Sequence, residues 1–202
     1  MLATSRALPV FRIFAPAAET WRSAVGAAAN APFSYAPVGG TGGPLPAGFD
    51  HDVQRLVVGR GEASWRRAVA ALRRWKQFDQ PWIRFHDPDL AIAPGAVVAF
   101  SSWQYGVWAL NLCRIVEVFD VPEGPVARFG FAHGTLEGHT VAGEERFELA
   151  WDRVTDEVSF EIRKFSRLRH WMVRAFGPLA RSLQKRFSRE ALESVRREVA
   201  GL

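Results

Sequence analysis

The densest group of chemically active side chains lies in segment 129–147, which holds two histidines and two adjacent glutamates. Side chains alternate between the two faces of a β-strand. His133 therefore shares a face with Phe131, and Glu145 shares a face with Phe147. If the aromatic face is the core face, both His133 and Glu145 point into the interior. An imidazole and a carboxylate placed there could bind a ligand or act as acid and base.

Two more charged residues fall on apolar strand faces. Lys164 shares a face with Phe160, and Arg114 is expected on the inner face of an earlier strand. A buried charge is costly unless it is paired, so one interpretation is an ion pair between Glu145 and either Arg114 or Lys164. A second is the polar end of a ligand pocket. A third is acid–base catalysis by His133 or Glu145, which needs a displaced pKa and a bound substrate.

The remaining candidate sites have weaker patterns. His139 lies in a glycine-flanked turn, where a side chain is usually exposed. The histidines and glutamates lack the spacing of a helical metal motif, so the sequence predicts no metal site and no cofactor. Cys113 lies in an apolar strand, so we expect a packed thiol rather than a reactive one. The glycines of 39–43 imitate a phosphate loop, but no lysine and helix follow.

The composition excludes several classes of protein. The chain has 202 residues, of which 48% are hydrophobic and 23% charged. These values suit one folded domain rather than a disordered chain. No uninterrupted apolar run approaches the ~20 residues of a membrane helix. The single cysteine excludes an internal disulfide and fits a reducing compartment, so we expect a cytoplasmic protein.

The formal net charge is +5, and the excess lies toward the C-terminal end. Between Arg163 and Arg197, basic side chains far outnumber the acids Glu190 and Glu193. A basic helix of this kind could contact nucleic acid or an anionic membrane surface. The alternative is a solvated arginine face on a helix whose apolar stripe packs inside its own domain.

These residues are positioned by a small set of expected elements. Apolar residues at helical spacing predict a helix over Glu62–Phe78, with Trp75 on its inner face. A second helical segment, Ser166–Val199, is interrupted by Gly177-Pro178. β-branched and aromatic runs separated by turn residues predict antiparallel strands. These runs are Val97–Tyr105, Val107–Phe119, Val126–Thr135, Glu144–Trp151 and Glu157–Phe165. The order predicts an α+β domain with a long helix laid across a sheet.

The N-terminal part of the chain follows a different pattern. Residues 1–31 are rich in alanine and arginine, which is typical of an organelle transit peptide. A short helix around Ala17–Ala29 is the alternative that we favour. Pro32–Gly48 predicts a strand and a glycine-rich loop that wraps against the domain. We therefore expect an N-terminal extension or short helix over 1–31 and a single domain over 32–202.

Several motifs occur in the order typical of a known family. The motifs are Tyr35-Ala-Pro-Val-Gly39-Gly-Thr41, Gly59-Arg-Gly61, Leu72-Arg-Arg-Trp75, Asn111-Leu-Cys-Arg114, Gly134-Thr-Leu-Glu-Gly-His139 and Gly143-Glu-Glu-Arg-Phe147. From about Pro32 to the C-terminus the sequence resembles the DUF1990 family. His139, Glu144 and Glu145 match the family pattern, whereas His133 stands where tyrosine is more frequent.

The resemblance also implies a fold. The family is similar to the START-like, helix-grip superfamily, in which a curved antiparallel sheet wraps around a long C-terminal helix. This similarity implies an apolar cavity between sheet and helix. We expect a cavity of ~300 Å³ or more. Its expected lining is Trp75, Phe100, Phe129, Phe131, His133, Phe147, Phe160 and Trp171, with Arg114, Glu145 and Lys164 as polar groups.

Three functions are compatible with these observations. The first is binding of a small hydrophobic molecule in the cavity. The second is a cyclase or hydrolase in the same cavity, with His139 and Glu145 as acid and base; this requires both side chains to reach one point of the cavity. The third is an interaction module whose basic helix meets nucleic acid or an anionic membrane surface. The sequence does not decide whether the protein is an enzyme.

Overall fold

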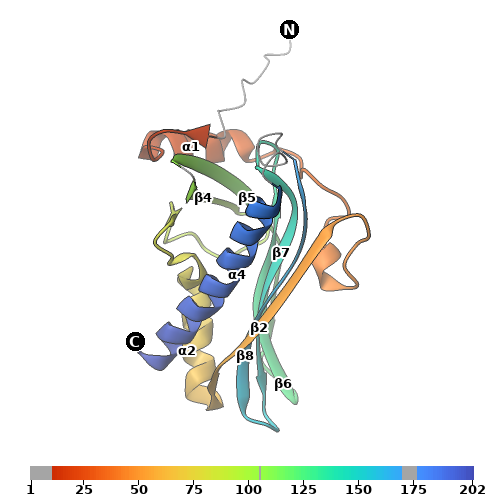
Figure 1. Ribbon diagram of the computed structural model, residues 1–202. Coiled ribbons are helices and arrows are strands. Elements are labelled where there is room, and N and C mark those ends of the chain that lie inside the picture. Colours follow the sequence, from red (N-terminus) through yellow and green to blue (C-terminus); the bar gives the residue numbers. More distant parts are fainter. Residues whose placement is uncertain (1–10, 105, 170–176) are drawn as a thin grey trace.

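The computed structural model describes residues 11–104, 106–169 and 177–202 (Figure 1). Its helices are α1 (Ala18–Ala28), α2 (Gly61–Arg73) and α4 (Gly177–Ala200), with the short 3-10 helices η1 (Gly40–Gly42) and η2 (Lys76–Phe78). Its strands are β1 (Phe11–Arg12), β2 (Asp50–Arg60), β3 (Ile83–Phe85), β4 (Val97–Gln104), β5 (Val107–Val121), β6 (Val126–Thr135), β7 (Val141–Asp152) and β8 (Glu157–Leu168).

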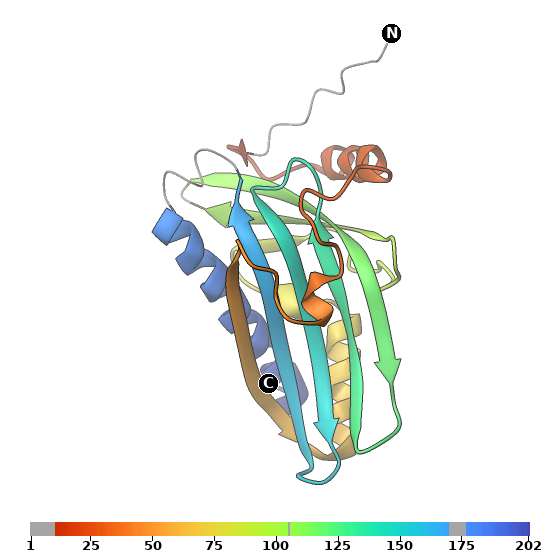
Figure 2. The same cartoon turned by 90° about the vertical axis from the view of Figure 1, so that its right-hand side faces the viewer.

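The described strands form one antiparallel sheet in the order β2-β8-β7-β6-β5-β4-β3, and β1 pairs with the start of β5. Strands β4 to β8 follow one another through short connections, as the sequence predicts. The sheet curls around α2 and α4, which lie on its inner side. Figure 2 shows the segment before β2 crossing the outer face. The expected α+β helix-grip fold is therefore confirmed.

The N-terminal region contains the short helix that the sequence favours. α1 packs against β4 and β5. After it, Phe33 makes a single bridge to Leu136, so the strand predicted within Pro32–Gly48 is reduced to one pair. The predicted wrapping of this segment is confirmed, because η1 contacts β7 and β8. The domain boundary expected at residue 32 stays a prediction.

Both long helices differ from their expected bounds. α2 ends at Arg73 instead of reaching Phe78, because Trp75 adopts a left-handed conformation with φ of 60° that an α-helix does not allow. β8 continues to Leu168, so the helix predicted from Ser166 is wrong at its start. The structure describes α4 over Gly177–Ala200, with Pro178 in its first described turn, and residues 170–176 of the predicted helical segment lie outside the described residues.

Aromatic side chains fill the interior near α2. The Trp75 ring stacks on Phe85 with centroids 4.8 Å apart and meets Phe131 edge-on at 5.2 Å. Phe131 lies 5.1 Å from Phe147, and both are fully buried. The Trp75 indole N–H donates to the Leu90 carbonyl at 2.8 Å, so its polar atom is satisfied. This part of the domain is a close-packed core.

A buried glutamate fastens the loop before β2 to the outer face of the sheet. The Glu144 carboxylate accepts hydrogen bonds from Tyr35 Oη at 2.6 Å and from the Gly39 amide at 2.7 Å. Thr41 donates to it twice, from its amide at 2.9 Å and its hydroxyl at 2.5 Å. Charge-assisted bonds of this kind are stronger than neutral ones. Glu144 therefore has a structural role that joins two of the family motifs.

Replacing this carboxylate should destabilise the protein. Glu144→Gln substitutes an amide N–H₂ for an acceptor that faces four donors, and we expect the free energy of unfolding to fall by about 2–4 kcal/mol. Urea denaturation measures the change. Glu157→Gln, on the neighbouring strand β8, is the control and should cost about 1 kcal/mol or less because its ion pair with Arg60 is largely exposed. Equal losses in the two variants would contradict this role.

Candidate functional site

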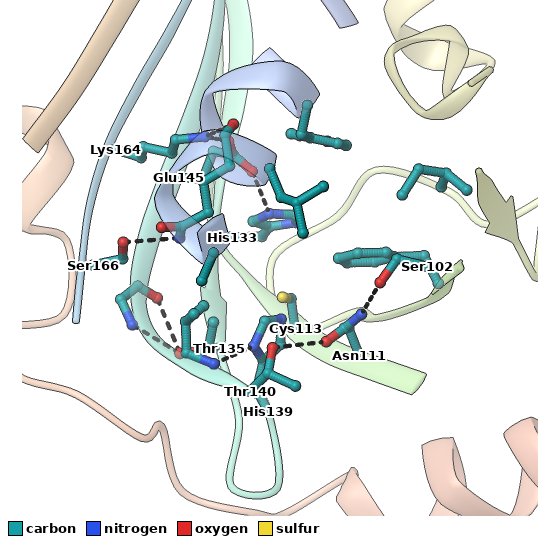
Figure 3. Close-up of a pocket in the computed structure, with 18 of the residues that line it drawn as sticks. Ser102, Asn111, Cys113, His133, Thr135, His139, Thr140, Glu145, Lys164 and Ser166 are labelled. Carbon is teal, nitrogen blue, oxygen red and sulfur yellow. Dashed lines mark hydrogen bonds and ion pairs between the residues drawn. The ribbon is translucent and has the colours of Figure 1, made fainter. Parts of the chain in front are cut away.

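A cavity of about 140 Å³ lies between the inner face of the sheet and the N-terminal half of α4 (Figure 3). Its apolar lining includes Phe100 on β4 and Leu183 and Phe187 on α4. Its polar lining includes Ser102, Asn111, Cys113, His133, His139, Thr140, Glu145 and Lys164. The cavity lining therefore combines apolar side chains from both the helix and the sheet with polar side chains that come mainly from the strands.

Four titratable side chains lie in a row across four strands. In the sheet register Asp52 on β2 is opposite Lys164 on β8, Lys164 is opposite Glu145 on β7, and Glu145 is opposite His133 on β6. Residues directly opposite one another on neighbouring antiparallel strands share a face. The register alone therefore places this ionic row on the inner face, and it brings together three of the predicted site residues.

The members of the ionic row are close enough to interact. His133 Nε2 lies 3.4 Å from Glu145 Oε2, and Lys164 Nζ lies 3.3 Å from Glu145 Oε1 and 3.5 Å from Asp52 Oδ2. His133 is 4% exposed and Lys164 is 7% exposed. Charges at this depth require partners, and here each carboxylate meets the same ammonium. The predicted ion pair between Glu145 and Lys164 is present.

Lys164 also joins the sheet to the C-terminal helix. Its ammonium donates to Ser188 Oγ at 2.6 Å and to the Gln184 carbonyl at 2.9 Å. Ser188 in turn donates to Asp52 Oδ2 at 3.2 Å. These bonds fix α4 against β2 and β8 beside the cavity. Sequence analysis missed Asp52 and Ser188, although the alternation of polar and apolar residues in 50–58 is a signal for β2.

The electrostatic surroundings keep Glu145 ionised. Burial favours the protonated carboxyl, but the Lys164 ammonium and the His133 imidazole outweigh that effect and hold the pKa of Glu145 below its ordinary value. Among the described groups, Glu145 Oε1 and His133 Nδ1 are buried and have no hydrogen-bond partner, although Oε1 faces the Lys164 ammonium at 3.3 Å. The site thus has unused hydrogen-bonding capacity beside the cavity.

Arg114 does not join this row. The residue opposite His133 on β5 is Ile115, so Arg114, one position earlier, points to the other face of the sheet. There its guanidinium donates to the Ala28 and Ala29 carbonyls at 2.6 and 2.8 Å. The expectation that Arg114 faces the interior is wrong. Its role is to hold the C-terminal end of α1.

Most of the predicted aromatic lining is packed core. Of that set, Phe100 lines the cavity and Trp171 lies outside the described residues. The structure places the other aromatic members in the close-packed interior, at most 3% exposed and outside the described cavity lining. These residues are Trp75, Phe129, Phe131, Phe147 and Phe160. These inward-facing aromatic side chains pack against one another, and Trp75, which follows α2, meets Phe131 edge-on.

His139 lines the cavity and is partly buried, instead of standing in solvent at a hairpin tip. Its Nδ1 accepts a hydrogen bond from the Val141 amide at 3.1 Å. Burial and the nearby His133 lower the pKa of His139 to about 3. The His139 ring is therefore neutral at physiological pH. It is a weak base, and it cannot act as an imidazolium acid. His139 and Glu145 share the cavity, but His139 is poorly suited to acid–base work.

Neither the Cys113 thiol nor the described His, Cys, Asp and Glu side chains form a nucleophilic or metal-binding site. Cys113 is buried on the floor of the cavity, and burial raises the pKa of its thiol well above the ordinary value. A protonated, enclosed thiol is a poor nucleophile. Within the described ranges, no three His, Cys, Asp or Glu residues are grouped to hold a metal ion.

The basic C-terminal helix is amphipathic. Its inner side chains, Leu192 and Val195 among them, are buried against the domain. On its outer side Arg186 forms an ion pair with Glu190 at 2.6 Å. The apolar stripe is thus used within the fold. Among the helices that the structure describes, none is long and apolar enough to cross a membrane.

A curled sheet that encloses a cavity with its C-terminal helix defines the class as a helix-grip protein. Residues 34–194 match the family model described as Domain of unknown function (DUF1990). The chain belongs to this family. A UPF0548 protein from Dictyostelium discoideum is 35% identical over 151 residues, which cover 71% of this chain and 70% of the relative. The corresponding protein from Arabidopsis thaliana is 33% identical over 155 residues, covering 75% and 74%.

A solved structure supports the fold. The crystal structure of hypothetical protein jhp0584 from Helicobacter pylori superposes with a TM-score of 0.50 and covers 81% of this chain and 94% of its own. The two sequences are 10% identical. The likeness therefore concerns the fold alone.

The low pKa of His139 predicts how stability depends on pH. An unfolded chain binds a proton at His139 near pH 6.5, whereas the folded chain binds it only near pH 3. Stability should therefore fall as pH drops through this window. In His139→Asn the fall between pH 6.5 and 4.5 should be smaller, as measured by urea denaturation at several pH values. His51→Asn, at an exposed position, is the control; profiles that coincide for all three proteins would contradict the assignment.

Proposed function

We propose that this protein binds a small, largely apolar molecule in the cavity between the sheet and α4, with the polar end of the molecule at the ionic row. The observation that supports this function is that the cavity lining combines apolar and polar side chains. Phe100, Leu183 and Phe187 supply apolar contact area, while His133 and Glu145 supply polar groups. Ligand pockets commonly combine an apolar wall with a few convergent polar groups.

The volume restricts the ligand. The cavity of about 140 Å³ is smaller than the ~300 Å³ expected from the sequence, because the core near α2 is filled by its own aromatic side chains. An apolar cavity of about 150 Å³ holds one benzene molecule. The part of a ligand that this volume takes up is therefore about one ring with a short polar substituent.

Catalysis and surface binding have less support. A cyclase or hydrolase that uses His139 needs a group that exchanges protons near neutral pH, and the pKa of His139 is about 3. Binding of nucleic acid or an anionic membrane surface by α4 stays a prediction, which salt-dependent affinity would test. The cytoplasmic location also stays a prediction.

Filling the cavity should abolish binding. In Leu183→Trp the larger ring occupies the ligand's space, and we expect the affinity for toluene, measured by ligand-observed NMR, to fall by about tenfold or more. Leu179→Trp is the matched control, because Leu179 lies one turn earlier on α4, is 42% exposed and is not among the described lining residues.

The control should bind toluene as the wild type does. Mass spectrometry of the purified wild type, under native conditions and after organic extraction, tests independently for a co-purified molecule. Equal toluene affinity in the wild type and in Leu183→Trp would show that the cavity is not the site, and absence of any binding would refute the proposed function.

A further inference from the structure

We infer that the polar end of the ligand is a hydrogen-bond donor, a hydroxyl or an ammonium group, and that carboxylate ligands are rejected. This inference rests on the proposed function and names the ligand chemistry of the same site. It depends on which hydrogen-bonding groups of the ionic row are already occupied and which are free to meet a ligand.

The Glu145 carboxylate beside the cavity has acceptor positions that no described donor fills. The carboxylate of Glu145 has two oxygens with about four acceptor positions. Its Oε2 faces His133 Nε2, and its Oε1 receives no hydrogen bond from the described residues, although Lys164 lies 3.3 Å away. His133 Nδ1 is also buried without a hydrogen-bond partner. The Glu145 carboxylate can only accept hydrogen bonds, so a donor completes it.

The cationic groups near the cavity are already engaged. Lys164 Nζ donates to Ser188 and to the Gln184 carbonyl and faces two carboxylates. Arg181 donates to Ser166 Oγ at 2.9 Å and forms an ion pair with Asp50. No described cation beside the cavity is left to neutralise an anionic ligand.

The charges of the ionic row also favour a ligand that donates a hydrogen bond over a carboxylate ligand. Asp52 and Glu145 carry two negative charges, and Lys164 alone is a permanent cation among them. A carboxylate ligand would add a third negative charge in a poorly solvated site, whereas a hydroxyl or ammonium group would meet an acceptor. Ser102, Asn111 and Thr140 can donate or accept, so they do not change this preference.

Four ligands of one shape test the inference. Toluene, benzyl alcohol, benzylamine and benzoate have the same ring and differ in the polar group. We expect benzyl alcohol or benzylamine to bind the wild type about tenfold more tightly than toluene at neutral pH, with benzoate weakest. The alcohol shows the contribution of the hydrogen bond, and the amine adds that of the charge.

Two variants test whether Glu145 causes the preference for donor ligands. Glu145→Gln removes the charge in nearly the same shape, and it should reduce the advantage of benzylamine over toluene by about fivefold or more. Glu148→Gln makes the same change on the outer face of β7 and should leave the ranking as in the wild type. The wild-type ranking itself tests the inference if Glu145→Gln does not fold.

The outcomes separate the inference from the proposed function. If benzoate binds as tightly as the donors, or if toluene binds equally well, the inference is overturned and cavity binding stands. If none of the four ligands binds the wild type, both are overturned. If the donors rank first and Glu145→Gln removes their advantage, both are supported.

Discussion

The pleat of β7 sends two adjacent carboxylates to opposite faces of the sheet, and much of the structure depends on this alternation. Glu144 points outward and fastens the loop that contains Tyr35. Glu145 points inward and completes the ionic row with Lys164. A slip of one residue in the register would exchange these environments and leave both carboxylates without their partners. Gly143 supports the register, because a Cβ atom there would lie 2.0 Å from the Phe165 carbonyl oxygen.

The cavity occupies one end of the domain because the other end is filled. α2 buries Leu72, Trp75 is buried just after the helix ends, and the aromatic side chains around them form a close-packed core. Near the start of α4 the inner surface carries polar side chains that cannot pack in this way. The helix is fixed to the strands beside the cavity by the Lys164 contacts with Ser188 and Gln184. A polar, partly open site is the result.

The fold was largely predictable from local patterns. Turn residues and β-branched runs locate β4 to β8, and helical spacing locates α2. Two errors have physical reasons. β2 mixes charged and apolar residues because it is an edge strand with one exposed face, so its pattern is weak. The helical segment expected from Ser166 was placed too early because Leu168 fits a helical stripe as well as a strand, and only pairing with β7 distinguishes the two.

For the site, the sequence by itself determined which residues could share a face. Period-two alternation placed His133, Glu145 and Lys164 inward, because it follows from the geometry of each strand alone. The tertiary structure decided which of these residues meet. A bulge in β5 and the cross-strand register turned Arg114 away and brought Asp52 into the row. The size of the cavity was also decided in three dimensions, because it depends on how far packed aromatic side chains fill the interior, and volume does not follow from spacing along a chain.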